Sequence, residues 1–250
     1  MCCLFLAASS TVAIAQTSVV DLVNPIIGTN GMGHTFPGAC VPFGLVQLSP
    51  DTDTIPHNVD GKYQPRSYEY CAGYQHKDSS IVGFSHTHFS GTGHSDLGDI
   101  LIMPTTGTLK LNPGTATNPD GGYRSRFSHG TEISRPGYYE VMLTDYGVKA
   151  QLTTTQRVGI HKYTYPTNSE NQRIILDMIH GIYNYDGKVL WTNIRVENDT
   201  LVTGYRITNG WARTNYTYFA MSFSKPITHY GCEEKAKVNY RGGYAKFNMK

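Results

Sequence analysis

Apolar runs broken at short intervals by turn residues dominate the second half of the chain. Arg135-Pro136-Gly137 and Asp145-Tyr146-Gly147 are two of these turn signals. The runs between them are rich in Val, Ile, Thr and Tyr, which is typical of β-strands, and none has a helical period. We expect strands over residues 137–143, 148–155, 158–165, 173–178, 189–196, 200–207 and 216–223. Their regular spacing predicts one all-β domain, an antiparallel β-sandwich.

The first half contains shorter apolar runs and longer polar stretches. Residues 81–84 and 100–103 have the length and composition of buried strands, and Pro104 is expected to end the second. Residues 41–48 alternate apolar and small side chains around a proline and a glycine, which fits a strand near a sheet edge. The polar stretch 49–66 has three prolines and no period, so we expect a long excursion over the surface.

The two ends of the chain predict processing and continuation. Residues 1–15, MCCLFLAASSTVAIA, are apolar and uncharged and end in the small-x-small pattern that a signal peptidase accepts. We expect this segment to be an export signal that is removed, and the protein to be periplasmic or extracellular. The segment is too short to span a membrane. Residues 244–250 alternate like a strand and then stop, so we expect the chain to be the front part of a longer polypeptide.

Charge and composition narrow the class of partner. Lys plus Arg number 21 against 19 for Asp plus Glu, so no strong electrostatic field attracts nucleic acid or an acidic membrane surface. Charged residues make up 16% of the chain, which has 26 glycines and 18 tyrosines. This composition suits a turn-rich β protein whose aromatic side chains stack on sugars. With the expected signal removed, Cys40, Cys71 and Cys232 remain, and we expect buried thiols with at most one bridge.

The densest chemistry lies in residues 74–99, where four histidines and four glycines accompany several acids. On a strand, residues two apart share a face, so His86 and His88 are expected to point the same way. A glycine-rich loop follows, with His94, Asp96 and Asp99 along its rim, and we expect a binding edge. For each residue alone, the alternative is that its side chain satisfies backbone groups of a tightly turned loop.

The same histidines allow a metal site as an alternative. His86, His88, His94 and Asp96 offer three imidazoles and a carboxylate, enough for a catalytic zinc with an open position. Metallohydrolases of the β-lactamase type carry His-x-His-x-Asp-His, whereas residues 89–93 intervene here. No Gly-x-Ser-x-Gly elbow or Walker lysine pattern is present, which argues against a serine hydrolase and a phosphate-binding loop.

Three strings of residues carry a family resemblance. They are Val-Asn-Pro-Ile-Ile-Gly-Thr at 23–29, Gly-His-Thr-Phe-Pro-Gly-Ala at 33–39 with Pro-Phe-Gly at 42–44, and Gly-Phe-Ser-His-Thr-His-Phe-Ser-Gly-Thr-Gly at 83–93 with Leu-Gly-Asp at 97–99. Together they resemble the amino-terminal domain of glycoside hydrolase family 92, over residues 20–250. The resemblance implies an inverting exo-α-mannosidase that needs calcium and acts on mannose-containing glycans.

The resemblance also implies how such a domain is used. In this family a β-sandwich packs on a carboxy-terminal (α/α)6 barrel, the active site lies where they meet, and the catalytic acid, base and calcium ligands belong mainly to the barrel. We therefore expect no catalytic residue and no metal ligand in this chain, which would be inactive alone. The residues expected at the sugar pocket or the domain interface are Gly33, His34, Thr35, Tyr74, His76, His86, Thr87, His88 and Ser90. A free-standing carbohydrate-binding module and the metal-dependent hydrolase remain the alternatives.

Overall fold

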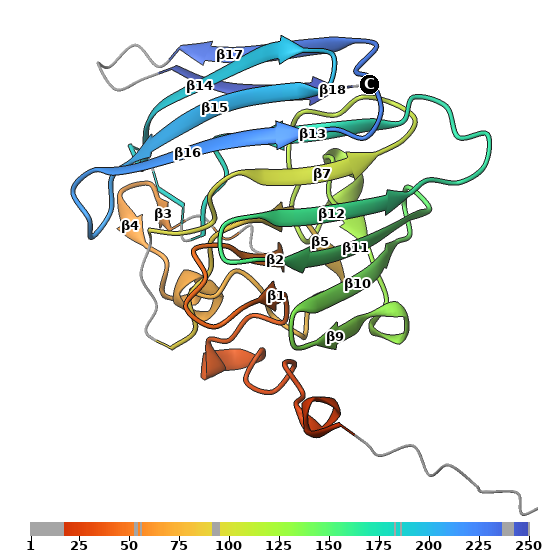
Figure 1. The fold of residues 1–250 in the computed structure, drawn as a ribbon. Coiled ribbons are helices and arrows are strands. Elements are labelled where there is room, and N and C mark those ends of the chain that lie inside the picture. Colours follow the sequence, from red (N-terminus) through yellow and green to blue (C-terminus); the bar gives the residue numbers. More distant parts are fainter. Residues whose placement is uncertain are drawn as a thin grey trace, which may run out of the picture.

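The computed structural model describes residues 18–52, 55, 57–91, 96–182, 184–185, 187–236 and 243–249. The expected export signal and His94 lie outside these ranges. Within them the regular secondary structure is almost entirely β-strand, and every strand pair is antiparallel. The antiparallel β-sandwich expected from the sequence is confirmed (Figure 1).

A seven-stranded sheet with the order β1-β2-β6-β7-β13-β18-β17 forms the centre of the fold. Its strands are β1 Ala39–Cys40, β2 Gln47–Asp51, β6 Gly83–Ser85, β7 Leu101–Thr105, β13 Arg173–Asp177, β17 Tyr230–Ala236 and β18 Gly243–Met249. All residues of β6 and β7 are buried. Strands covered on both faces appear in the sequence as continuous apolar runs, which explains why these two lack alternation.

Two smaller sheets cover parts of the large one. One has the order β12-β11-β10-β9, and the other has the order β14-β15-β16. Their strands are β9 Ile133–Arg135, β10 Tyr138–Leu143, β11 Val148–Thr154, β12 Gly159–Thr164, β14 Val189–Asn198, β15 Leu201–Thr208 and β16 Asn215–Ser222. In Figure 1 the β14–β16 sheet lies above and the β9–β12 sheet below, with β7 between them in the view.

Two apolar cores fix the small sheets in place. In the first, Leu48 and Phe84 of the large sheet pack with Val141, Ala150 and Leu152 of the β9–β12 sheet. In the second, Ile102 and Leu176 pack with Val202, Ile194 and Phe219 of the β14–β16 sheet. Burying apolar surface is worth about 25 cal/mol per Å², so these two contact regions stabilise the sandwich.

Short elements complete the described fold. The hairpin strands are β3 Asn58–Val59 and β4 Lys62–Tyr63, and β5 Ser80–Ile81 pairs with β8 Ser125–Arg126. The helices are 3-10 turns, namely η1 Val19–Leu22, η2 Gly31–Gly33, η3 Pro65–Tyr70, η4 Pro119–Gly121 and η5 His129–Thr131. No helix in the described ranges has the length and apolar character that crossing a bilayer requires.

The strand predictions for the second half are confirmed within a few residues, whereas several for the first half are wrong. Residues 41–46 form a turn and not a strand, because Gly44 N–H donates to Val41 O at 3.0 Å. Residues 49–51 belong to β2 and not to a surface excursion. Pro104 was expected to end its strand, but it lies within β7. Proline has no N–H to donate, and β7 tolerates it because β6 pairs with β7 only at Phe84 and Ile102, so Pro104 faces no β6 partner.

The expectation of buried thiols is confirmed for Cys71 and wrong for Cys40 and Cys232, which are exposed.

Candidate functional site

The residues that the sequence nominated are distributed over several local clusters. Gly33, His34, Thr35 and Ser90 lie in or beside a tightly folded loop, residues 28–35, which we call the Gly28 loop. His88 contacts the buried Asp51, and His86 forms a pair with His161. Thr87 contacts the buried Asp99. Tyr74 and His76 lie beside Glu132. Each cluster is built by different elements and has its own chemistry.

The Gly28 loop is closed by its own backbone. Thr35 N–H donates to Gly28 O at 3.3 Å, and the Thr35 hydroxyl donates to Ile27 O at 2.9 Å. Gly28 has φ +83°, and a Cβ on Gly33 would lie 2.1 Å from Gly28 O. Only glycine fits at Gly33, so the two glycines permit this close approach of backbone to backbone.

His34 follows η2 near the end of this loop and has a left-handed conformation, with φ +50°. Its side chain is buried and packs edge-on against the Tyr68 ring at 4.9 Å between centroids. Its Nε2 atom has no hydrogen-bond partner among the described residues. A buried polar atom without a partner costs about 1–3 kcal/mol. The Nε2 atom of His34 thus has one hydrogen-bonding position that the described residues leave unfilled.

Neighbouring segments hold the Gly28 loop. Gly31 N–H donates to Gln75 Oε1 at 2.7 Å, and Gln75 Nε2 donates back to Gly31 O at 2.8 Å. On the other side, Gly91 N–H donates to His34 O at 2.9 Å, which brings the exposed Ser90 next to the loop. Segments around 31–35, 75 and 90–91 thus meet, as the sequence motifs suggested.

His88 belongs to a buried centre around Asp51. His88 Nε2 lies 2.8 Å from Asp51 Oδ1, and His180 Nε2 lies 2.8 Å from Asp51 Oδ2. His88 Nδ1 lies 2.7 Å from Gln47 O, so both of its ring nitrogens face acceptors. Burial acts to raise the pKa of Asp51, but the charge of His88 and the hydrogen bonds from both histidines hold it far below its ordinary value. His88 therefore anchors the fold through Asp51.

Gly73 makes room for this centre. It has φ +83°, and a Cβ there would lie 2.1 Å from Asp51 Oδ1 and 3.2 Å from the His88 ring. No other residue is compatible with both the conformation and the space.

Thr87 contacts a second buried carboxylate. Its hydroxyl donates to Asp99 Oδ2 at 2.8 Å and accepts from Asp99 N–H at 2.9 Å. Arg206 Nε lies 3.1 Å from Asp99 Oδ1, and both side chains are buried. Asp99 was expected at the rim of a loop, but it is part of the interior, because β15 places Arg206 on its buried face.

Lys188 lies near this pair, and sequence analysis missed it. Its Nζ donates to Leu97 O at 3.0 Å and to Ile182 O, with no exposed surface. Burial, followed by repulsion from Arg206, lowers the pKa of Lys188 to about 7. A lone lysine before a strand gives no sequence signal for burial.

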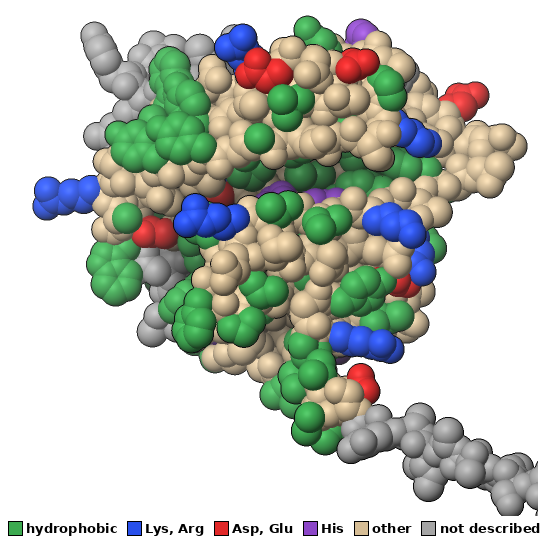
Figure 2. Space-filling model, in the orientation of Figure 1, with side chains coloured by type: hydrophobic (Ala, Val, Ile, Leu, Met, Phe, Trp, Pro, Cys, Tyr) green, Lys and Arg blue, Asp and Glu red, His purple; other side chains and the backbone are tan. Residues whose placement is uncertain are grey.

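His86 forms a pair with His161 across the two sheets. Their Nε2 atoms are 3.0 Å apart, His86 Nδ1 lies 2.7 Å from Ile100 O, and His161 Nδ1 lies 2.7 Å from the Tyr163 hydroxyl. Because a carbonyl only accepts, His86 Nδ1 carries the proton and its Nε2 accepts from His161. Figure 2 shows a hollow between the upper and lower halves of the molecule in which histidine side chains are visible.

Burial keeps both imidazoles of the pair neutral. It lowers the pKa of His86 to about 4. Burial, followed by repulsion from His86, lowers the pKa of His161 well below its ordinary value. Both groups thus act as dipoles in a hydrogen-bonded chain and not as cations.

The metal-hydrolase alternative of His86, His88, His94 and Asp96 is not favoured by these contacts. Both nitrogens of His86 and both of His88 are engaged by other groups. Asp96 accepts N–H bonds from Trp211 at 2.6 Å and Ala212 at 2.9 Å, so it holds the loop before β16. His94 lies outside the described residues.

Tyr74 and His76 point toward Glu132. The Tyr74 hydroxyl donates to both oxygens of Glu132, at 2.9 and 3.0 Å, and the Tyr139 hydroxyl donates at 2.6 Å. Burial, reinforced by the charge of Glu132, raises the pKa of both phenols, so they stay protonated donors. His129 Nδ1 lies 2.7 Å from Glu132 Oε2, and the His76 and His129 rings are 3.9 Å apart.

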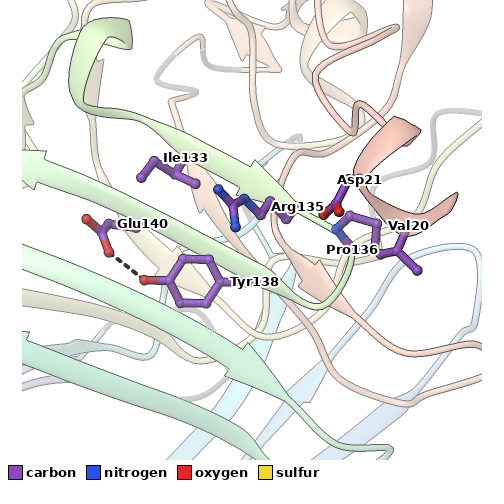
Figure 3. A pocket seen from close by; sticks show the side chains of 7 residues that line it. All are labelled: Val20, Asp21, Ile133, Arg135, Pro136, Tyr138 and Glu140. Carbon is purple, nitrogen blue, oxygen red and sulfur yellow. Dashed lines mark hydrogen bonds between the residues drawn. The ribbon is translucent and has the colours of Figure 1, made fainter. Parts of the chain in front are cut away.

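An open pocket lies between η1 and the β9–β10 hairpin. Val20, Asp21, Ile133, Arg135, Pro136, Tyr138 and Glu140 line it (Figure 3). None of the residues nominated from the sequence lines it, and Tyr138 bonds to Glu140 within it. We assign it no chemistry.

Comparison with known proteins identifies relatives of the whole described domain. The model of the glycosyl hydrolase family 92 N-terminal domain matches residues 22–249. A solved family GH92 alpha-mannosidase from Bacteroides thetaiotaomicron, in complex with mannoimidazole, is 40% identical, with a TM-score of 0.79 over 92% of this chain and 30% of that chain. The structure of the same enzyme without mannoimidazole gives a TM-score of 0.80 over 94% of this chain and 32% of that chain.

A second relative comes from a fungus. An uncharacterized secreted glycosidase of Arthroderma benhamiae is 28% identical over 170 residues, which is 64% of this chain and 19% of that protein. The chain thus spans about a third or less of the length of the relatives that it matches.

The packing around Asp51 predicts that two glycine substitutions lower the free energy of unfolding by very different amounts. Gly61→Ala, at φ +76° with nothing within 4 Å of the new Cβ, is expected to cost about 1 kcal/mol of unfolding free energy. Gly73→Ala adds a clash with Asp51 to the same backbone strain and is expected to cost about 3 kcal/mol or more. Urea denaturation of both variants measures the difference, and equal costs would contradict the packing described here.

The histidine pair predicts a loss of stability in mild acid. The pKa of His86 is about 4 when folded and about 6.5 when unfolded, so the unfolded chain binds more protons between these values. The contribution of His86 to the free energy of unfolding is therefore complete above about pH 6.5 and falls by about 3 kcal/mol toward pH 4. Replacing both rings, with His86→Asn and His161→Gln, should reduce the slope of unfolding free energy between pH 7.5 and 5.0.

The control for this slope is His229→Ala, which removes an exposed histidine. It should leave the pH dependence unchanged. An identical slope in the wild type and the double variant would show that the buried pair does not stay neutral.

Proposed function

The chain belongs to glycoside hydrolase family 92, as its amino-terminal domain, and from this premise we propose that it works as one wall of the sugar site of an α-mannosidase. The proposed reaction is hydrolysis of terminal α-mannosides from glycans with inversion. The observation that carries this proposal is 40% identity over 92% of the chain with an alpha-mannosidase solved with mannoimidazole.

The Gly28 loop is the part of this chain that we assign to the sugar site or to the seam with a second domain. The unpartnered Nε2 of His34 supports this assignment, because a sugar hydroxyl or a backbone group would complete it. Ser90 lies next to the loop with an exposed side chain. Gly33 and Thr35 shape the loop through backbone contacts and place His34.

Exposed apolar side chains near the Gly28 loop support a second domain as partner. Leu22, Ile27 and Met32 are 75%, 73% and 62% exposed, and Phe89, beside Ser90, is 57% exposed. Apolar side chains gathered on a surface mark interaction sites. We propose that this face packs on a carboxy-terminal (α/α)6 barrel and that the domain is inactive without it.

The requirements of an inverting reaction indicate which domain supplies the acid and the base. An inverting glycosidase holds an acid and a base about 6.5–9.5 Å apart on opposite sides of the sugar bond, with a water at the base. Asp51 and Asp99 are buried and engaged by histidine, threonine and arginine, so neither serves as that acid or base. We place the acid and the base in the second domain, while this chain orients the sugar and excludes water.

Calcium, implied by the family, does not fit the carboxylates described here. It takes six to eight oxygen ligands, whereas nitrogen atoms of His88, His180 and Arg206 contact Asp51 and Asp99. We therefore place the calcium ligands in the second domain as well and derive no step through the ion.

Export of the enzyme is part of the proposal. The apolar residues 1–15 support it, and the fungal relative is described as secreted. A periplasmic or extracellular location gives the enzyme access to glycans.

A carbohydrate-binding role apart from catalysis is the second candidate. The outer face of the β14–β16 sheet carries Trp191, Tyr216 and Tyr218, which are 48%, 57% and 70% exposed. The Tyr218 ring lies 5.6 Å from that of Tyr205 in the neighbouring strand. Aromatic faces of this kind stack on sugar rings. Affinity electrophoresis of the chain in mannan-containing gels tests this role, because Trp191→Ala should then abolish the retardation.

The leading proposal predicts a kinetic effect of His34. His34→Asn keeps a residue that tolerates the left-handed conformation but removes the imidazole. In the full-length enzyme, kcat/KM for an α-mannoside should fall about 10- to 100-fold, the value of one lost hydrogen bond in a buried site. His229→Ala, at an exposed position, is the control. Wild-type kinetics of His34→Asn with an unchanged melting temperature would remove His34 from the site.

A further inference from the structure

We propose that His76, His129 and Glu132 bind one divalent transition metal ion, with zinc as the ion that best fits the donors. We call these three residues the His2Glu cluster. One ligand atom of each residue lies within 4.8 Å of those of the other two. The inference does not depend on the mannosidase proposal, because it rests on the geometry of this cluster alone.

Backbone pairing brings the cluster together from two distant segments. His76 lies shortly before β5, whereas His129 is the first residue of η5 and Glu132 directly follows it. Strand β5 pairs with β8, and Phe127 N–H donates to Ser79 O at 3.0 Å, so the two segments run beside each other. The turn of η5 then places His129 and Glu132 on the same side, with Glu132 N–H bonded to His129 O at 3.2 Å.

The donor set suits zinc and not calcium. Two imidazoles and one carboxylate are the protein ligands of a common type of catalytic zinc site, in which a fourth position is left for water. Imidazole nitrogen also binds other late first-row ions, such as cobalt. Calcium prefers six to eight oxygens, so this cluster and a calcium site in the same enzyme would bind different ions.

Glu132 is already oriented as a ligand. Its side chain is 3% exposed, and three groups contact its oxygens, namely the hydroxyls of Tyr74 and Tyr139 and the ring of His129. Hydrogen bonds of this kind to a ligating carboxylate fix its position and tune the metal. The two phenols are neutral, and His129 is a cation only when it is protonated, so the buried carboxylate of Glu132 has no permanent positive partner among these groups. A divalent ion would neutralise its charge.

The two histidines can complete the site with a small movement. In a tetrahedral site with bonds of about 2.0–2.1 Å, ligand atoms are about 3.3 Å apart, somewhat closer than in the present cluster. The side chain of His129 is 38% exposed, and His76 is half-buried, so both rings have room to rotate. The two ring planes are now tilted by 33°, with 3.9 Å between their centroids.

A bound ion would link the segment before β5 to η5 and β9. Its role would be to fix the positions of these segments, and through His76 N–H, which bonds to Thr29 O at 2.8 Å, the start of the Gly28 loop. The competing account is a metal-free stack in which His129 bonds to Glu132 and His76 packs on it.

Cobalt and zinc titration of the full-length protein tests the proposal. After treatment with a chelator and dialysis, the wild-type protein should bind one equivalent of Co²⁺ more than the His129→Ala variant. The bound Co²⁺ should give the visible absorption bands of a nitrogen-ligated ion of low coordination number. Competition with Zn²⁺ should remove the bands. His129→Ala and Glu132→Gln should each weaken binding at least 100-fold, whereas His229→Ala should bind like the wild type.

Tyr139→Phe separates a metal site from a hydrogen-bonded stack. It removes one donor to Glu132 while leaving all three ligands, so metal affinity should fall about 10-fold. Because Glu132 is buried, the His129→Ala variant, altered at a half-exposed position, decides the outcome if Glu132→Gln does not fold. Equal cobalt binding and equal spectra in the wild type and His129→Ala would overturn the proposal, whatever the mannosidase activity.

Discussion

The buried carboxylate of Asp51 is the constraint on which the surrounding loops depend. An ionised carboxylate in an apolar interior is stable only when charged or strongly polar partners surround it. Here His88 comes from the loop after β6 and His180 from the segment after β13, so one residue of β2 ties three parts of the chain together. Gly73 adds a fourth segment, because only a residue without a side chain can pass beside the carboxylate. The Gly28 loop is then held against this framework by Gln75, two residues further along.

A second set of buried charges likewise ties separate segments of the chain together, next to the β14–β16 sheet. Asp99, Arg206 and Lys188 join the loop before β7 to the β14–β15 hairpin, and Thr87 completes the contacts of Asp99. Most of the conspicuous polar residues of the 83–99 motif therefore maintain loop geometry, and few remain for a ligand. This distribution suits a domain that supplies a rigid surface. His34 Nε2 is one of several buried polar atoms without a hydrogen-bond partner among the described residues, and it is the one that lies in the Gly28 loop.

The sequence predicted the fold more completely than the site, for physical reasons. Strands such as β10 and β11 have one buried and one exposed face, so their alternation reveals both length and orientation. The strands of the first half have two to five residues and no alternation, and tight turns such as that at Phe43 resemble strands in composition. The rule that His86 and His88 share a face failed because β6 ends at Ser85. Family motifs located the Gly28 loop, but no local pattern relates Lys188, or His76 and Glu132, to partners far away in the chain.

The hydrogen-bonded chain from Tyr163 through His161 and His86 to Ile100 has a fixed direction. It ends on a carbonyl oxygen, which can only accept, so each group upstream must donate toward it. The aligned bonds add their dipoles, and neighbouring members polarise each other. Reversing the chain would require the carbonyl of Ile100 to donate a hydrogen bond, which it cannot do. The hydrogen bonds that link β12 to the large sheet therefore keep one direction while both imidazoles are neutral.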